Sequence, residues 1–206
     1  MYNESDRTNL AIVSMALGLL FIWGVLVALL QIKLINSIKP VNIQTFKAIV
    51  VVVGFMTLLA LIAEIVSTSM TNTASLWNLS PSEAYITASP NYIEVVTKYS
   101  VIAFIPQFLG VALIHSKYKF TGFQWFIIYG IIGYLNEWLA FGEAASWVSI
   151  PYWIIIYGWI AYLPTQVIRP LKDRLNVKFY HYVLAVLWPI LISVPWVLLV
   201  NYWWHI

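Results

Sequence analysis

Six apolar stretches, each about as long as a membrane-crossing helix, divide this sequence from end to end. They cover residues 10–34, 48–70, 95–115, 123–141, 147–168 and 182–204. A helix needs about 20 predominantly apolar residues to cross the hydrocarbon core of a bilayer. The composition agrees, because 62% of the residues are hydrophobic and only 9% are charged, whereas soluble domains carry about 25% charged residues. The sequence therefore predicts an all-α, polytopic membrane protein in which residues 1–206 form one six-helix transmembrane domain.

The charged residues between these stretches predict how the chain crosses the membrane. The loops after the first, third and fifth stretches hold most of the basic residues: Lys33, Lys39, Lys47, Lys117, Lys119, Arg169, Lys172, Arg174 and Lys178. The other segments hold Glu4, Asp6, Glu83, Glu94 and Glu143, with Arg7 and Lys98. Because cytoplasmic loops are enriched in Lys and Arg, we expect both termini outside. The short cytoplasmic loops predict three antiparallel helix hairpins.

Several classes of function are disfavoured by the residues that are missing. The chain has no cysteine, which excludes disulfides, thiolate metal sites and a cysteine nucleophile. Its three histidines fall at predicted helix ends, so a pair facing a haem within the bilayer is not expected. We therefore predict no cofactor and no metal. Nucleic acid is not expected as a partner either, because the basic residues lie in short loops rather than in a foldable domain.

Two carboxylates inside the apolar stretches are the first candidates for a functional site. A carboxylate near the centre of a spanning helix costs at least about 2.5 kcal/mol on insertion scales. Glu64 lies on a stripe with Ser67 and Thr68, and Glu137 follows Asn136. We expect both carboxylates to share one interior with Gln107 and Asn136. The alternative is structural, since a protonated glutamate hydrogen-bonded to a neighbour also holds helices together.

Small and aromatic residues suggest where a passage would run. Gly130 and Gly133 precede Glu137 on one helical face, which suits either close helix packing or a narrow passage. Most tryptophans in membrane proteins belong to interfacial belts, but Trp153 and Trp159 fall well inside the fifth stretch. Such rings either fill the core or narrow a pore.

The layout and a few local segments resemble the urea channel and amide transporter family of bacteria. The last helix carries the nearest matches, Lys178-Phe179, Val194-Pro195-Trp196 and Tyr202-Trp203-Trp204-His205. The turn from Ile114-His115-Ser116 to Gln124-Trp125-Phe126 and the tryptophans Trp147, Trp153 and Trp159 are also similar to the family. The chain departs from it in the third helix, where Phe104 to Gly110 replace the family segment, and in the sixth, where Leu187 stands near an expected acidic residue. The resemblance implies a ring of independent pores in a prokaryotic plasma membrane.

The leading hypothesis is a channel or facilitator for a small neutral solute, such as urea or a short amide, working as a homo-oligomer. The residues expected along the path are Glu64, Gln107, Asn136, Glu137, Trp153 and Trp159. Selectivity would come from the pore diameter and from the donors and acceptors that line it. Two alternatives stay open: an intramembrane lipid- or isoprenoid-modifying enzyme that uses Glu64 and Glu137, and a non-catalytic subunit of a larger membrane complex.

Overall fold

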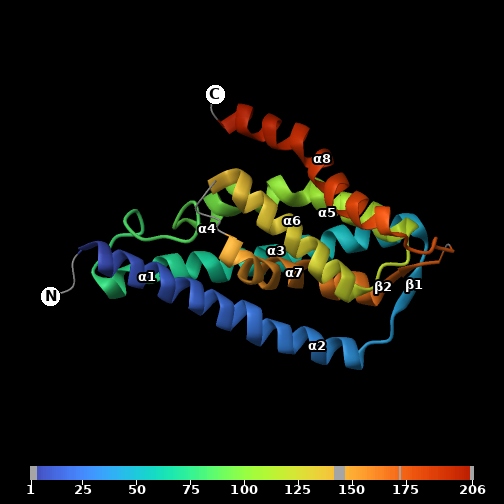
Figure 1. The fold of residues 1–206 in the computed structure, drawn as a ribbon, viewed down its shortest axis with the longest axis horizontal. Coiled ribbons are helices and arrows are strands. Elements are labelled where there is room, and N and C mark those ends of the chain that lie inside the picture. Colours follow the sequence, from blue (N-terminus) through green and yellow to red (C-terminus); the bar gives the residue numbers. More distant parts are fainter. Residues whose placement is uncertain (1–3, 142–146, 172, 205–206) are drawn as a thin grey trace.

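The protein is almost entirely helical (Figure 1). The computed structural model describes residues 4–141, 147–171 and 173–204. Glu143, Lys172 and Ile206, which entered the topology argument, lie outside the described residues. Each of the six predicted apolar stretches is helical over most of its described part, with a break at Ser100 and the start of a strand at Ile168.

The first two stretches form the longest helical rods. The first rod consists of α1 (Glu4–Leu19), a π-helical segment η1 (Leu20–Val27) and α2 (Ala28–Ser37). The second consists of α3 (Thr45–Thr71) and a 3₁₀ turn, Asn72–Trp77. The rods hold few charges because Leu, Ile, Val and Ala dominate them.

The remaining stretches form four further long helices, two of which pack against α3. A short helix α4 (Tyr92–Glu94) and a π-helical segment η3 (Val95–Tyr99) lead into α5 (Val101–Lys117), with a bend of 50° at the break. The last three are α6 (Gly122–Phe141), α7 (Ile150–Val167) and α8 (Phe179–Trp204).

Three helices of the described chain are long and apolar enough to cross a membrane. They are Ser5–Ser37, Thr45–Trp77 and Phe179–Val200, and the bent pair formed by η3 and α5 makes a fourth if it counts as one span. Helices α6 and α7 have 20 and 18 residues but carry many Tyr, Trp and Gly residues. Their side chains are less hydrophobic than the aliphatic ones of α1 to α3, although an aromatic ring also suits a membrane interface.

Helix packing departs from the expected pairs of hairpins. The most extensive contacts join α6 to α7, α5 to α8 and α3 to α5. Helices α5 and α6, which the short loop connects, touch mainly through side chains such as Phe108 and Tyr129, whose ring centroids are 5.9 Å apart. The three-hairpin prediction therefore describes the connectivity of the chain but not its closest packing.

Glycine allows the two closest helix pairs to approach. A Cβ atom on Gly130 would lie 2.6 Å from the Cα atom of Ile154, and one on Gly110 would lie 2.6 Å from the Cα atom of Pro189. Distances below 3.0 Å to backbone atoms are not tolerated, so only glycine fits at either crossing. The sequence thus sets the α6–α7 and α5–α8 contacts through its small residues.

A two-stranded parallel ladder joins segments far apart in the sequence. Strand β1 (Val41–Ile43) precedes α3 and pairs with β2 (Ile168–Pro170), which follows α7. These strands were not predicted, because each is only three residues long and lies between apolar stretches. The ladder satisfies backbone groups that a loop would leave to water.

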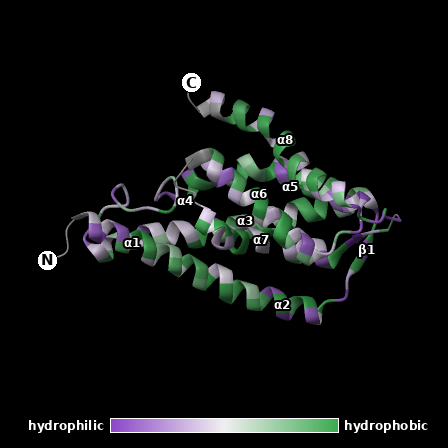
Figure 2. Cartoon of the chain, in the orientation of Figure 1, coloured by the Kyte–Doolittle hydropathy of each residue, from purple (hydrophilic) through white to green (hydrophobic). Residues whose placement is uncertain are grey.

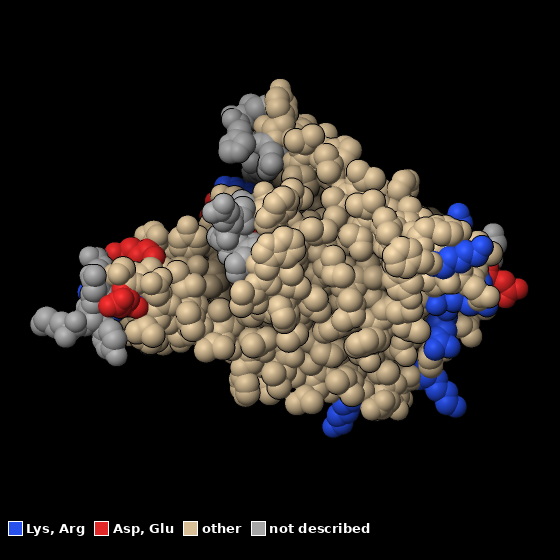
Figure 3. All heavy atoms as spheres, viewed as in Figure 1, with Lys and Arg blue, Asp and Glu red and all other residues tan. Residues whose placement is uncertain are grey.

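On the face shown in Figure 3 the charged side chains gather mainly toward the two ends, and most of the surface between the ends is uncharged. The helices between the ends are mostly hydrophobic (Figure 2). The end that holds β1 and β2, called the basic end below, carries Lys33, Lys39, Lys47, Lys117, Lys119, Arg169, Arg174 and Lys178, with Asp173. The opposite end, called the acidic end, carries Asp6, Glu83 and Glu94, with Arg7 and Lys98. Wide uncharged faces with exposed Leu, Ile, Val and Phe side chains are what a lipid-facing surface requires.

Candidate functional site

The carboxylates of Glu64 and Glu137 lie near the acidic end, and Tyr157 binds that of Glu137. Glu137 on α6 is half-buried and accepts a short hydrogen bond from the hydroxyl group of Tyr157 on α7. Both helices are within about two turns of their acidic-end termini at this level. Tyr157 also packs against the ring of Phe104 from α5, with centroids 6.2 Å apart. Glu137 therefore has a polar partner in the interior.

Glu64 lies close enough to Glu137 and Tyr157 for its charge to act on both groups. Its carboxylate accepts a hydrogen bond of 3.1 Å from the Ser67 hydroxyl group, one turn later on α3. The structure thus brings α3, α6 and α7 together around the two carboxylates. We call Glu64, Glu137 and Tyr157 the carboxylate cluster.

Gln107 and Asn136 form a second and different polar group. Their amides pair reciprocally, each donating to the other over 3.0 Å. Gln107 Nε2 also lies 3.3 Å from the hydroxyl oxygen of Ser193 on α8. We expected these side chains to share one interior. They form two separate hydrogen-bonded groups instead, one facing α7 and the other facing α8. The two amides serve as each other's hydrogen-bond partners, so this second group holds α5, α6 and α8 together. We call Gln107 and Asn136 the amide clasp.

Trp153 and Trp159 on α7 are half-buried, and their indole N–H groups have no partner among the described residues. The ring of Trp153 lies 5.9 Å from that of Tyr157, next to the carboxylate cluster. Trp159 packs against Phe126, with centroids 4.7 Å apart. Among the described residues, four buried side-chain atoms lack a hydrogen-bond partner, namely Trp153 Nε1, Trp159 Nε1, Gln31 Oε1 and Thr68 Oγ1. Such atoms mark places where water or a polar ligand is needed.

Gln31 was not among the residues expected at the site. It is only 2% exposed, and its amide donates a hydrogen bond of 3.1 Å to the backbone carbonyl of Trp159. This contact leaves the side-chain oxygen of Gln31 unpaired close to α7. The sequence signal was weak, because a single glutamine near the end of an apolar stretch is usually assigned to the interface.

Of the two alternatives for the small-residue face of α6, the structure shows close helix packing at Gly130 and Gly133. The side chain of Tyr157 occupies the position next to Gly133 where a Cβ atom would lie. The backbone of Ile154 does the same at Gly130. This face therefore serves helix packing. It places the Tyr157 hydroxyl group beside Glu137, one turn further along α6.

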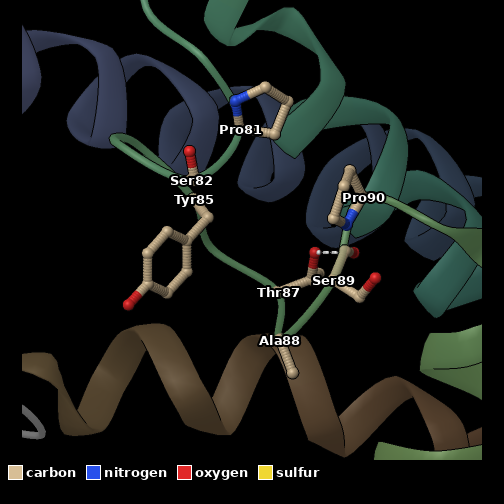
Figure 4. A pocket seen from close by; sticks show the side chains of 7 residues that line it. All are labelled: Pro81, Ser82, Tyr85, Thr87, Ala88, Ser89 and Pro90. Atoms are coloured by element: carbon tan, nitrogen blue, oxygen red, sulfur yellow. Dashed lines mark hydrogen bonds between the residues drawn. The ribbon is translucent and has the colours of Figure 1, made fainter.

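The loop of residues 78–91 forms an open depression at the acidic end (Figure 4). It has a volume of about 430 Å³ and lies within residues 81–90. The loop is tied back to α3, since Thr71 Oγ1 lies 3.0 Å from Thr87 Oγ1 and accepts from the Ile86 amide. Its lining includes neither Glu64 nor Glu137.

No group of three metal-binding side chains occurs among the residues that the structure describes. In comparisons with known proteins, no family model matches the chain, and neither a curated protein nor a solved structure matches it. The resemblance to urea channels therefore stays a prediction from the residues quoted for it.

Proposed function

We propose that this protein facilitates the passage of a small neutral solute, such as urea or a short amide, across a prokaryotic plasma membrane. The supporting observation is the set of unpaired polar atoms along α7. Trp159 follows Trp153 by six positions, which corresponds to about 9 Å along the helix. Donors without a partner among the described residues therefore occur at two depths along α7, the first of them beside the carboxylate cluster.

The chemistry of these atoms fits a neutral amide. An amide offers a carbonyl oxygen that accepts from indole N–H groups and an amino group that donates to oxygens such as Gln31 Oε1. A catalytic site that transports nothing would need polar groups at only one depth along the helices. In the described conformation packed rings fill the route between the two levels, so passage requires these rings to move.

Flux measurements test this proposal. Purified protein in liposomes should speed the equilibration of urea or a short amide without ATP or an ion gradient. Trp153→Phe keeps a ring and removes the donor, so we expect flux to change by up to about tenfold, the effect of one hydrogen bond. Trp188→Phe is the matched control, because this side chain on α8 is 41% exposed. Fluxes equal to those of empty liposomes, from folded protein, would reject the proposal.

The topology that goes with this function has all six helices crossing the membrane and both termini outside. It is supported by the separation of Lys and Arg from Asp and Glu at the two ends (Figure 3). Single-cysteine labelling tests it cleanly, since the chain has no native cysteine. An impermeant thiol reagent should label Ser82→Cys from outside and Lys39→Cys only after the membrane is opened. The opposite pattern would reverse the orientation.

The hydrogen bond from Tyr157 to Glu137 favours a second candidate, an intramembrane enzyme acting on a lipid or isoprenoid. A carboxylic acid with a neighbouring carboxylate and a tyrosine hydroxyl group has the groups needed for general acid–base chemistry. Glu137→Gln removes the titrating proton and nearly preserves the shape. Mass spectrometry of membrane lipids from cells that express either form would show a product made only by the unchanged protein. Identical lipid profiles would exclude this activity for the lipids present.

A further inference from the structure

A groove on the surface between α6 and α8 opens near the basic end. It has a volume of about 270 Å³, close to the roughly 300 Å³ at which small-ligand pockets begin. Its walls are Phe123, Ile127 and Ile131 on α6 and Tyr182 and Val186 on α8. These side chains make the groove apolar along its length. The groove is open to the side of the bundle, where a membrane protein meets acyl chains.

Hydrogen bonds and ring packing hold the side chains at the polar end of the groove in place. The side-chain oxygen of Gln124 accepts a hydrogen bond of 2.8 Å from the Thr121 amide, which caps α6, and its amino group donates to the Tyr182 hydroxyl group over 2.5 Å. Phe120 packs edge-on against Tyr182, with centroids 5.3 Å apart. The Tyr182 oxygen accepts in this arrangement, so its own proton can be donated to a ligand at the groove mouth.

Two exposed lysines lie in the segments that lead into the two walls of the groove. Lys119 lies three residues before α6 begins, and Lys178 comes immediately before α8. Backbone contacts hold their segments together, because the Lys119 amide donates to the carbonyl of Leu175 over 2.9 Å. The ring of Tyr118 lies 4.0 Å from that of His181, whose Nδ1 accepts from the Lys178 amide.

The positive charge at this mouth is not neutralised within the described part of the chain. Among the described residues, the ion pair between Lys98 and Glu94 lies at the acidic end, away from this mouth. Asp173 is exposed at the basic end and forms no ion pair within 4.0 Å among the described residues. Arg174, close by, turns one guanidinium nitrogen to the His115 carbonyl oxygen at 3.5 Å and is only half-buried.

We propose that this groove binds one anionic phospholipid, with an acyl chain between α6 and α8 and the headgroup phosphate between Lys119 and Lys178. Lysine is a common phosphate ligand, and each basic residue near a membrane surface contributes about 1 kcal/mol to the binding of anionic lipid. A zwitterionic lipid fits the same groove but gains less from the two lysines. An apolar groove ending at a pair of uncompensated lysines matches both parts of an anionic phospholipid at once.

Lipid titration monitored by native mass spectrometry tests the proposal in detergent-purified protein. The first molecule of dioleoyl phosphatidylglycerol should bind at least about tenfold more tightly than dioleoyl phosphatidylcholine. Lys119→Gln with Lys178→Gln should weaken the phosphatidylglycerol complex by about fivefold for each lysine. Lys33→Gln with Lys39→Gln removes the same charge near the end of α2 and should change binding by less than twofold.

A second pair of variants tests the apolar part of the site. Ile127→Trp fills the groove and should weaken the first phosphatidylglycerol complex severalfold, whereas Leu191→Trp adds a ring to an exposed position of α8 and should not. Val186→Phe replaces Ile127→Trp if that variant unfolds below the assay temperature. Equal effects of the two lysine pairs would mean a diffuse attraction to the basic end, and unchanged binding in the groove-filling variants would mean that no chain lies there. Either result overturns the proposal.

Discussion

Tyr157 on α7 donates a hydrogen bond to the carboxylate of Glu137 on α6, and the tyrosine ring rests against Gly133 one turn away on the same helix. The glycine that brings the two helices together thus also places the hydroxyl group at the carboxylate. Close packing of the two helices and a hydrogen-bond partner for Glu137 are therefore two effects of one contact.

Removal of the Tyr157 hydroxyl group should destabilise the protein. Tyr157→Phe keeps the ring but leaves Glu137 without its donor, and a lost partner for a buried polar group costs about 1–3 kcal/mol. Thermal unfolding in detergent would show the loss. Tyr162→Phe is the control, because it makes the same substitution on α7 at a tyrosine whose ring packs against Trp159. Equal melting temperatures for both variants would mean that the Tyr157 bond adds no stability.

Alanine at Gly133 should disturb the contact of α6 with α7. The added methyl group would overlap the Tyr157 ring, and overpacking of this kind costs typically about 1–3 kcal/mol. Gly54→Ala on α3 serves as the comparison, since nothing lies within 4 Å of its Cβ position. There the better helix propensity of alanine should leave stability unchanged or raise it by up to about 1 kcal/mol. Both effects are measurable as shifts of the unfolding midpoint.

The amide clasp should behave as one unit. Gln107→Leu leaves the Asn136 amide unpaired and should cost about 1–3 kcal/mol of unfolding free energy, and Asn136→Leu should cost a similar amount. The double variant removes both polar groups, so its cost should be smaller than the sum of the two single costs. A double-mutant cycle measures this difference. Additive costs would show that the two amides do not depend on one another.

The pKa of Glu83 should show whether the loop of residues 78–91 is folded. Hydrogen bonds from the Ser80 hydroxyl group (2.7 Å) and the Ser80 amide (2.6 Å) lower the pKa of this carboxyl group from its ordinary value. A carboxylate with a lowered pKa stabilises the folded loop above the unfolded pKa of about 4.3, and this contribution disappears as the pH falls through the folded pKa.

Carbon-detected NMR of labelled glutamate would measure this pKa directly. Ser80→Ala should raise it toward the ordinary value, while Ser37→Ala, whose hydroxyl group bonds to the Lys33 carbonyl oxygen in α2, should leave it unchanged. An unchanged titration in the Ser80 variant would assign the shift to another cause, such as the nearby charge of Arg7.

The helices could be predicted from the sequence because apolar length is a local property. All six stretches are helical over most of their described parts, and the sorting of charges to two ends follows from the same pattern. The packing could not be predicted so well. Gly110 and Gly130 select the partners of their helices through close approach to Pro189 and Ile154, and a glycine in the sequence does not reveal which helix it faces.

The site shows the same division between local and tertiary information. Glu64 and Glu137 were recognisable because a carboxylate in an apolar stretch is rare, and the structure brings them near one another. Tyr157, Ser193 and Gln31 were not recognised, since a tyrosine, a serine and a glutamine are common near helix ends and in aromatic helices. Their roles appear only when a partner from another helix is known.

The β1–β2 ladder has a mechanical consequence. It joins the residues just before α3 to those just after α7, with Val41 opposite Ile168. These two helices carry Glu64 and Tyr157, far from the ladder. Their basic-end termini are clamped together, so a relative tilt of α3 and α7 pivots there and grows in amplitude toward the acidic end. A tilt of α3 against α7 about the ladder would therefore change the separation between Glu64 and Tyr157.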